Sequence, residues 1–414
     1  MRWSTLLRTS IALRVAPALL IWVLAYVGNV NAWVVEGYWA SVTGQSSFLL
    51  GFTAPACAAC AAWEGARVKA SRVLDGAPVR SAAAVAGWRM LPVLVMGLLA
   101  VLLPLAVLAP EAAGSPGGPT LSILGVELLV VAAHTALGYA AGQTMSALLA
   151  VPLVTVGSFV WMAYPASLNT FWVRQLNGHN LSGCCALDQQ VSYRALAAAG
   201  LVAVGMVAGA LLWLAGRTRL LRAGAALVVA SALAAGSAAA VPLGYRASVA
   251  RDRSLLRCDS GQPQVCLWPE QRGAAGDVRA WADQAHSRLA AAGVPDSGPL
   301  MLLTARPTRG EVVDAVARSA VTPTAPECAR TGVWPGARAV GPVRAWLTIS
   351  AGGALQDLNG KLRPDDAQLV RQLVAAPADA QLAWYRANSA AMASCDRVPE
   401  LDPGRYLADA PGRG

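Results

Sequence analysis

Charged residues are scarce in this chain of 414 residues, because Asp, Glu, Lys and Arg make up only 14% of it while 56% is hydrophobic. Soluble globular domains carry about 25% charged residues. The shortage therefore excludes an ordinary soluble protein. Lysine is scarcer still, since only Lys69 and Lys361 contribute to the 33 basic residues. With so much alanine and glycine, this bias is typical of a GC-rich bacterium.

Several catalytic motifs are missing as well. The sequence has no Gly-x-x-x-x-Gly-Lys-Ser/Thr loop, the loop that cradles ATP phosphates in P-loop ATPases. Any ATP hydrolysis must therefore come from another polypeptide. His-Glu-x-x-His and Gly-x-Ser-x-Gly are also missing. His286, the one histidine of the C-terminal part, falls on the polar face of an expected helix. We expect no enzymatic activity, no cofactor and no metal.

Long apolar runs are abundant instead. Each is long enough to cross a hydrocarbon core about 30 Å thick. The first is long for the hydrophobic region of a signal peptide, and no small-x-small cleavage site leads out of it, so we expect a retained helix. The sequence predicts an α-helical polytopic membrane bundle of seven helices at residues 1–244. The seven runs are 15–35, 46–63, 90–109, 121–141, 145–164, 195–214 and 223–243.

Basic residues flank these runs mainly on one side, which predicts the orientation. Short cytoplasmic loops are enriched in Lys and Arg. On the other side lie only Arg174 and Arg194. We therefore expect a multi-pass protein of the bacterial cell membrane, with a cytoplasmic N-terminus and residues 245–414 outside the cytoplasm. The residues on the basic side are Arg2, Arg8, Arg14, Arg67, Lys69, Arg72, Arg80, Arg89, Arg217, Arg219 and Arg222.

Residues 245–414 predict a small mixed α/β domain. Val278, Trp281, Ala285 and Leu289 share one face of an amphipathic helix at 277–292. Acidic and basic residues are nearly balanced here, and no basic patch interleaved with aromatics indicates nucleic-acid binding. Further helices are expected at 310–321, 365–374 and 378–394, and buried strands at 300–304 and 345–349.

The cysteines divide by compartment. Four lie in the C-terminal domain, where an oxidising environment permits disulfides. Four cysteines allow three pairings; we expect Cys258–Cys266 and Cys328–Cys395. His179, Cys184 and Cys185 carry metal-ligand residue types, but adjacent cysteines rarely suit zinc. A disulfide from one of them to another exported cysteine is favoured.

Four further residues lie inside the apolar runs. Cys57 and Cys60 in a run of alanines indicate small packing residues, with redox or metal chemistry as the alternative. Glu127 and His134 are seven residues apart, hence on one helical face. Ionisable groups at membrane depth often line a substrate route or relay a proton. The alternative is a structural hydrogen-bonded pair.

The loop after the second run carries a distinctive pattern. Residues 64–74 predict a short basic helix along the inner face, ended by Asp75-Gly76 and by Pro78. Such a helix can lie on anionic lipid headgroups or be held by a soluble partner. Its candidate contact residues are Glu64, Arg67, Lys69, Arg72, Leu74, Pro78 and Arg80.

With this loop, the later pattern Ala-Leu-Gly138-Tyr-Ala-Ala-Gly142 followed by Leu149-Ala-Val-Pro152 resembles the membrane subunits of type-2 ABC exporters, over residues 1–222 at most. The resemblance implies that 64–80 is a coupling helix docking on a separate ABC ATPase subunit. It also implies a second permease or a homodimer within the bilayer. A seventh run and an exported domain are additions to the six runs usual in that family.

The start of the C-terminal domain, from Cys258 to Glu270, resembles the opening of a domain of unknown function found on some actinobacterial membrane proteins. This resemblance implies no activity. Two functions are therefore expected: a permease-like subunit of an ABC-type exporter, or alternatively a membrane-anchored extracytoplasmic binding or sensing protein without transport activity.

Overall fold

The chain divides into two compact units, Met1–Arg251 and Asp252–Gly414. The computed structural model describes residues 9–72, 81–216, 218–295, 298–321, 326–354 and 362–407. The first unit extends past the expected boundary at residue 244, because strand β2 (Ser248–Ala250) pairs antiparallel with β1 (Gln189–Val191). Residues 245–251 therefore belong to the helical unit.

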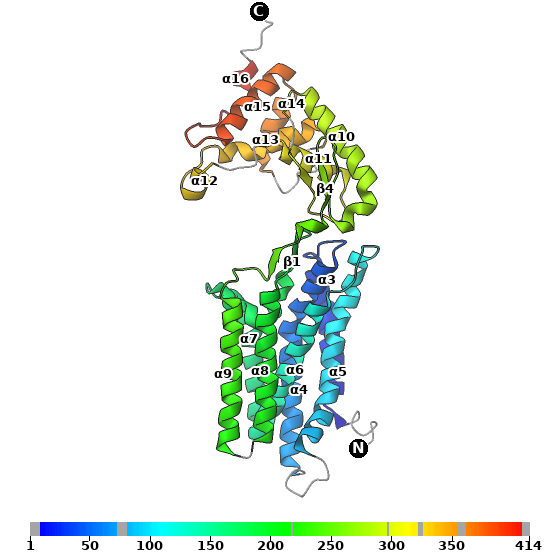
Figure 1. Ribbon diagram of the computed structural model, residues 1–414, viewed down its shortest axis with the longest axis vertical. Coiled ribbons are helices and arrows are strands. Elements are labelled where there is room, and N and C mark those ends of the chain that lie inside the picture. The colour runs from blue at the N-terminus through cyan, green and yellow to red at the C-terminus, as the bar shows by residue number, and fades with distance from the viewer. Residues whose placement is uncertain are drawn as a thin grey trace, which may run out of the picture. The chain divides into compact units, whose positions relative to one another are not determined.

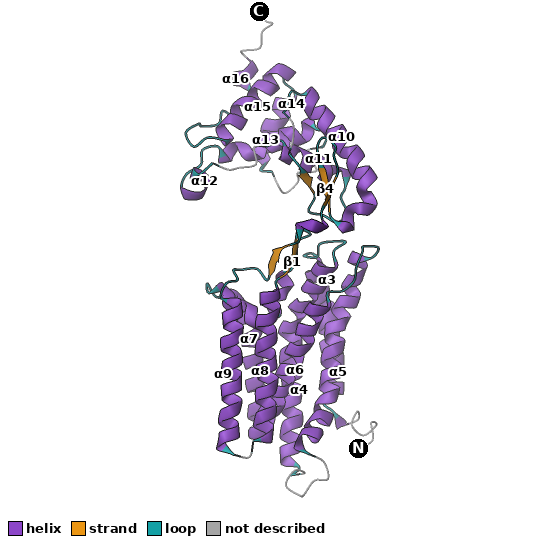
Figure 2. Cartoon of the chain, viewed as in Figure 1, coloured by secondary structure: helices purple, strands orange, loops and turns teal. Residues whose placement is uncertain are grey.

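The first unit is a bundle of long helices, seen side by side in Figures 1 and 2. Among the described residues, seven helical segments are long and apolar enough to cross a membrane, and each overlaps one expected run. They comprise α2 (Ala12–Asn31), α3–η1–α4 (Trp39–Ser46, Ser47–Leu49, Leu50–Ala70), α5–η2 (Ala82–Leu108, Ala109–Ala112), α6 (Leu121–Thr144), α7–η3 (Ala147–Ala163, Tyr164–Ser167), α8 (Tyr193–Ala215) and α9 (Arg219–Ala240).

The second segment is longer than the sequence indicates. The expected run covered 46–63, whereas the helical path is continuous over the 32 residues Trp39–Ala70. At 1.5 Å per residue this is about 48 Å, more than the roughly 30 Å of a hydrocarbon core. Pro55 lies buried inside α4 and does not end it. The segment thus runs from one end of the bundle to the other.

Glycines let two helix pairs approach closely. A side chain at Gly138 or Gly142 of α6 would collide with the carbonyls of Ala58 or Ala62 of α4. A side chain at Gly209 of α8 would collide with the side chain of Val229 of α9. Small residues commonly bring membrane helices into such contact. The pattern Gly138-x-x-x-Gly142 is therefore a packing surface between α4 and α6.

The two ends of the bundle differ in character. We call one end the Glu64 end. It holds the start of α2 and the ends of α4 and α6. The opposite end, here the Cys184 end, carries the turns between α7 and α8: η4 (Phe171–Leu176), η5 (His179–Gly183) and β1. Gly44 of α3 lies against the carbonyl of Leu181 of η5, so this connection packs onto the second helical segment.

The second unit is mainly helical, with a small sheet. Strand β4 (Val265–Leu267) pairs antiparallel with β3 (Arg257–Cys258) and parallel with β5 (Leu300–Met301). The other elements are η6 (Arg253–Leu255), η7 (Pro269–Ala274), α10 (Ala275–Ala291), α11 (Arg309–Ser319), α12 (Cys328–Thr331), α13 (Ala337–Ser350), α14 (Pro364–Val374), α15 (Ala378–Met392) and α16 (Gly404–Leu407).

One expected strand of this unit is wrong. Residues 345–349 lie inside α13, and the expected strand at 300–304 is reduced to Leu300–Met301. Helix α13 buries Ala345, Trp346 and Leu347 in succession. A helix covered on several sides shows a continuous apolar run, and such a run also suits a buried strand.

Candidate functional site

The segment expected to be a separate coupling helix is part of α4. Residues 64–70 continue α4 without a break, so the expectation of a short helix lying along the membrane face is wrong for them. Arg72 follows with a left-handed φ of 52°. Leu74, Pro78 and Arg80 lie outside the described residues.

Glu64 is the centre of this end of the bundle. Its side chain is fully buried, and Oε1 accepts a hydrogen bond from the backbone N–H of Ile11 at 3.0 Å. Arg67 Nη1 lies 3.4 Å from the same oxygen, and Arg89 Nη1 lies 3.6 Å from Oε2. Burying a carboxylate is costly unless it is paired in this way. Glu64 therefore joins α2, α4 and α5.

The basic residues of the segment have separate partners. Arg67 Nη1 also donates to the carbonyl of Thr9 at 2.7 Å, and Lys69 Nζ donates to the carbonyl of Thr144 at 2.6 Å. That carbonyl ends α6, where a cation is favoured by the helix dipole. The Arg72 side chain is exposed and makes no hydrogen bond or ion pair within the described ranges. Of the three, Arg72 is the one free for a partner.

Glu127 and His134 are both buried in α6 but contact different elements. Glu127 Oε1 accepts a hydrogen bond from Ser46 of α3 at 3.3 Å, while its Oε2 has no hydrogen-bond partner within the described chain. His134 Nδ1 lies 2.9 Å from Ser158 Oγ of α7. The shared helical face does not join the two residues to each other, because they lie two turns apart.

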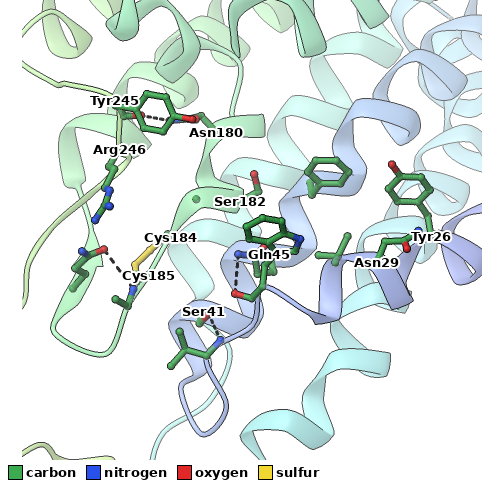
Figure 3. Close-up of a pocket in the computed structure, with 17 residues that line it drawn as sticks. Tyr26, Asn29, Ser41, Gln45, Asn180, Ser182, Cys184, Cys185, Tyr245 and Arg246 are labelled. Atoms are coloured by element: carbon green, nitrogen blue, oxygen red, sulfur yellow. Dashed lines mark hydrogen bonds between the residues drawn. A yellow bond between two sulfur atoms is a disulfide. The ribbon is translucent and has the colours of Figure 1, made fainter. Parts of the chain in front are cut away.

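A cavity of about 770 Å³ opens at the Cys184 end of the helical unit. We call it the Cys184 cavity. In Figure 3, Tyr26 and Asn29 come from one wall, and Arg246 lies on the side of the Cys184–Cys185 disulfide. Its volume falls within the range of small-molecule sites. The lining residues are Tyr26, Asn29, Val30, Trp33, Val35, Ser41, Gln45, Phe48, Asn180, Ser182, Gly183, Cys184, Cys185, Ala186, Gln189, Tyr245 and Arg246.

The disulfide in this wall joins adjacent residues. Cys184 bonds to Cys185, so the expected bond to a distant exported cysteine is wrong. The His179 ring packs 5.2 Å from the ring of Phe48, and burial lowers the pKa of His179. Within the described ranges no group of three or more His, Cys, Asp or Glu side chains could hold a metal ion.

The remaining cysteines follow the sequence expectation for pairing. Cys258 bonds to Cys266, directly across the β3–β4 ladder, and Cys328 bonds to Cys395 with a Cα separation of 5.8 Å. Cys57 and Cys60 are free and buried in α4. Cys57 Sγ lies 3.9 Å from the carbonyl of Val93. Both free thiols occupy helix-packing positions.

Sequence reasoning did not find the Cys184 cavity. Its residues come from three regions far apart in the chain, 26–48, 180–189 and 245–246, and no one of them alone indicates a cavity. One signal was available: Asn29, Ser41 and Gln45 are polar positions in or beside the first two apolar runs. Polar residues that border apolar runs are common at membrane interfaces, however, and they do not specify a shared cavity.

Comparison with known proteins finds a family match for part of the second unit only. Residues 265–395 match a family described as a domain of unknown function, DUF7224. No curated protein and no solved structure matches the chain. The similarity therefore covers most of the C-terminal domain and does not extend to the helical bundle.

Proposed function

We propose that the chain is the membrane-spanning, permease-like subunit of an ABC-type exporter and works with a separate ATPase. One observation carries the proposal: the segment Trp39–Ala70 is continuous. It lines the Cys184 cavity at its start, and near its end it bears Glu64, which is paired with Arg67 and Arg89. Ser41, Gln45 and Phe48 form part of the cavity wall. A partner bound beside Ala70 would act on the same helical path that shapes the cavity.

The contacts of this segment support such coupling. Glu64, Lys69 and Gly65 are bound to α2, α5 and α6, with Gln143 Nε2 donating to the carbonyl of Gly65 at 2.9 Å. A displacement of the end of α4 therefore moves its neighbours too. Since the sequence has no phosphate-binding loop, the energy must come from another polypeptide.

Arg72→Glu tests the docking role. Arg72 is exposed and ends the described part of the segment, so reversing its charge should release an ATPase and leave the bundle folded. Arg67 is less suitable, because a glutamate there would face the buried Glu64. Arg219→Glu, an exposed arginine at the same end of the bundle, is the matched control. Affinity purification in mild detergent, followed by identification of the bound chains and assay of ATP hydrolysis, is the measurement.

The outcomes separate the two functions. Recovery of an ATPase with the wild type and Arg219→Glu but not with Arg72→Glu supports the exporter. If no nucleotide-hydrolysing chain is recovered with any of the three, the exporter proposal fails. A membrane-anchored binding or sensing protein is then favoured, since the C-terminal domain is a compact unit with its own core and two disulfides.

A further inference from the structure

The polar groups of the Cys184 cavity are unusually free. The side chains of Asn29, Ser182 and Arg246 form no hydrogen bond or ion pair with another described residue, and neither does the Tyr26 hydroxyl. Gln189 uses its Oε1 for Ala186 and Ser248, which leaves its Nε2 for a ligand. A purely apolar ligand would strip water from these groups without replacing its hydrogen bonds. The cavity therefore suits a ligand with several hydroxyl or similar groups.

The charge of the lining points to an anion. None of the seventeen lining residues is acidic, and Arg246 is exposed to the cavity. A second cation lies just behind the wall: the guanidinium carbon of Arg174 is 4.1 Å from the centre of the Tyr245 ring. Arg174 is buried, and its Nε has no hydrogen-bond partner within the described chain. Arginine binds phosphate and carboxylate with paired, charge-assisted hydrogen bonds.

The aromatic rings point to a ring-shaped ligand. Trp33 is 74% exposed and Tyr245 is 60% exposed, although both border the cavity. Tyr26 and Phe48 stack with their planes 9° apart. Aromatic faces also attract quaternary ammonium groups, but the arginines and the missing carboxylates oppose a cation. The C–H faces of a sugar-like ring satisfy the aromatic surfaces without that conflict.

We propose that the Cys184 cavity binds a polyhydroxylated ring that carries one anionic group, as in a phosphorylated or acidic sugar. Arg246 binds the anionic group, Asn29, Ser182 and Gln189 bind hydroxyls, and Trp33 and Tyr245 cover the ring faces. The ligand is either a free molecule or the head group of a lipid. The proposal concerns binding alone and does not depend on an ATPase.

Calorimetric titration of the purified full chain tests this proposal. The detergent must lack a sugar head group, and the buffer must lack phosphate. Inositol 1-phosphate supplies ring and charge, inositol the ring alone, and glycerol 3-phosphate the charge alone. We expect inositol 1-phosphate to bind at least about tenfold more tightly than either control, a difference of about 1.4 kcal/mol. Inositol lacks the charge-assisted hydrogen bonds to Arg246, and glycerol 3-phosphate lacks the ring and its further hydroxyls. Equal affinities for inositol 1-phosphate and glycerol 3-phosphate would overturn ring recognition.

Two variants and their controls locate the site. Arg246→Gln should weaken binding of inositol 1-phosphate about tenfold or more, whereas Arg253→Gln, another exposed arginine, should not. Trp33→Ala should weaken binding, whereas Trp63→Ala, an exposed tryptophan of α4 outside the cavity, should not. Unchanged affinity in Arg246→Gln would refute the proposed site, whatever the ATPase experiment gives.

A second arm of the experiment tests whether the ligand is a free molecule or the head group of a lipid. Nanodiscs with phosphatidylinositol should show Arg246-dependent binding if the anionic ring belongs to a lipid, and nanodiscs with phosphatidylglycerol serve as control. Binding of phosphatidylinositol but not of inositol 1-phosphate assigns a lipid head group. Absence of binding in both arms overturns the proposal.

Discussion

The buried carboxylate of Glu64 accepts a hydrogen bond from the backbone amide of Ile11, 53 residues earlier in the chain, at 3.0 Å. Ile11 is the residue that precedes α2, so this contact caps the first long helix with a group from the end of the second segment. The negative charge there also favours the start of a helix. One side chain thus sets the spacing of two helices and holds Arg67 and Arg89 beside them.

Removing this carboxylate should destabilise the bundle. Glu64→Ala should cost about 2–3 kcal/mol, less than a fully buried ion pair because Arg67 is partly exposed. Glu64→Gln keeps an acceptor for Ile11 and should lose less. Thermal unfolding in detergent measures both, with the exposed Glu36→Ala as control. Equal midpoints for Glu64→Ala and Glu36→Ala would show that the cluster does not contribute to stability.

The glycines of α6 should tolerate no added methyl group. Gly138→Ala and Gly142→Ala should each cost about 1–3 kcal/mol, because the new Cβ meets backbone carbonyls of α4. Gly157→Ala in α7 has open space around its Cβ and should be neutral or slightly stabilising through helix propensity. Thermal unfolding of the three variants should therefore give opposite signs. Destabilisation by Gly157→Ala of equal size would contradict the packing argument.

Labelling of introduced cysteines should establish the orientation. Gly118 precedes α6 at the Cys184 end, and Arg219 begins α9 at the Glu64 end. The natural free thiols, Cys57 and Cys60, are buried. A membrane-impermeant maleimide should label Gly118→Cys in intact cells and Arg219→Cys only after permeabilisation. The reverse result would place the C-terminal domain in the cytoplasm and overturn the exporter proposal.

The two disulfides of the C-terminal domain should differ in their effect on stability. On the chain-entropy model, loss of Cys328–Cys395, with a separation of 67 residues, costs about 4 kcal/mol. Loss of Cys258–Cys266, with a separation of 8, costs about 2.5 kcal/mol. Paired serine variants of the full chain, followed by hydrogen exchange of the domain's amides, test this order. A larger effect from Cys258–Cys266 would contradict it.

Acid should weaken the start of the same domain through Asp259. Burial raises the pKa of this carboxyl, but hydrogen bonds from the Val265 and Gly261 amides and from Arg279 outweigh it and hold the pKa below its ordinary value of 3.8. A lowered pKa stabilises the fold above the ordinary value, and the gain is lost as pH falls through the lower value.

Asp259→Asn should therefore be less stable than the wild type at pH 7, and the difference should shrink as pH falls below 3.8 toward the lowered pKa. Hydrogen exchange between β3 and β4, corrected for the intrinsic pH dependence, measures the difference. The exposed Asp365→Asn is the control. A difference between Asp259→Asn and the wild type that persists unchanged at low pH would refute the role of the charge.

The long helices and the amphipathic helices of the second unit follow from local pattern, and the sequence predicts them. The expected apolar runs overlap all seven segments that the described chain offers for a membrane. At α13 the prediction failed, because burial on several sides removes the helical period from residues 345–349. Local pattern is informative only where one face of an element is exposed.

The candidate site depends on contacts between residues far apart in the chain, and local sequence pattern does not reveal such contacts. The basic residues 67, 69 and 72 suggested a surface helix, yet Glu64 and the carbonyls of Thr9 and Thr144 satisfy two of them inside the bundle. The mutual bond of Cys184 and Cys185 also depends on local backbone geometry. Charge and residue type drew attention to this segment, but they did not show which of its basic side chains are already bound within the bundle.

The close glycine contacts limit how this bundle can change shape. Because the α4 and α6 backbones are in contact at Gly138 and Gly142, these two helices are expected to move as one rigid body. The Gly209 contact joins α8 and α9 into a second rigid body. Helix α7 contributes no such glycine contact, since Gly157 faces open space. The bundle would therefore have few degrees of freedom. The largest relative motion is expected along the seam between the α4–α6 pair and the α8–α9 pair.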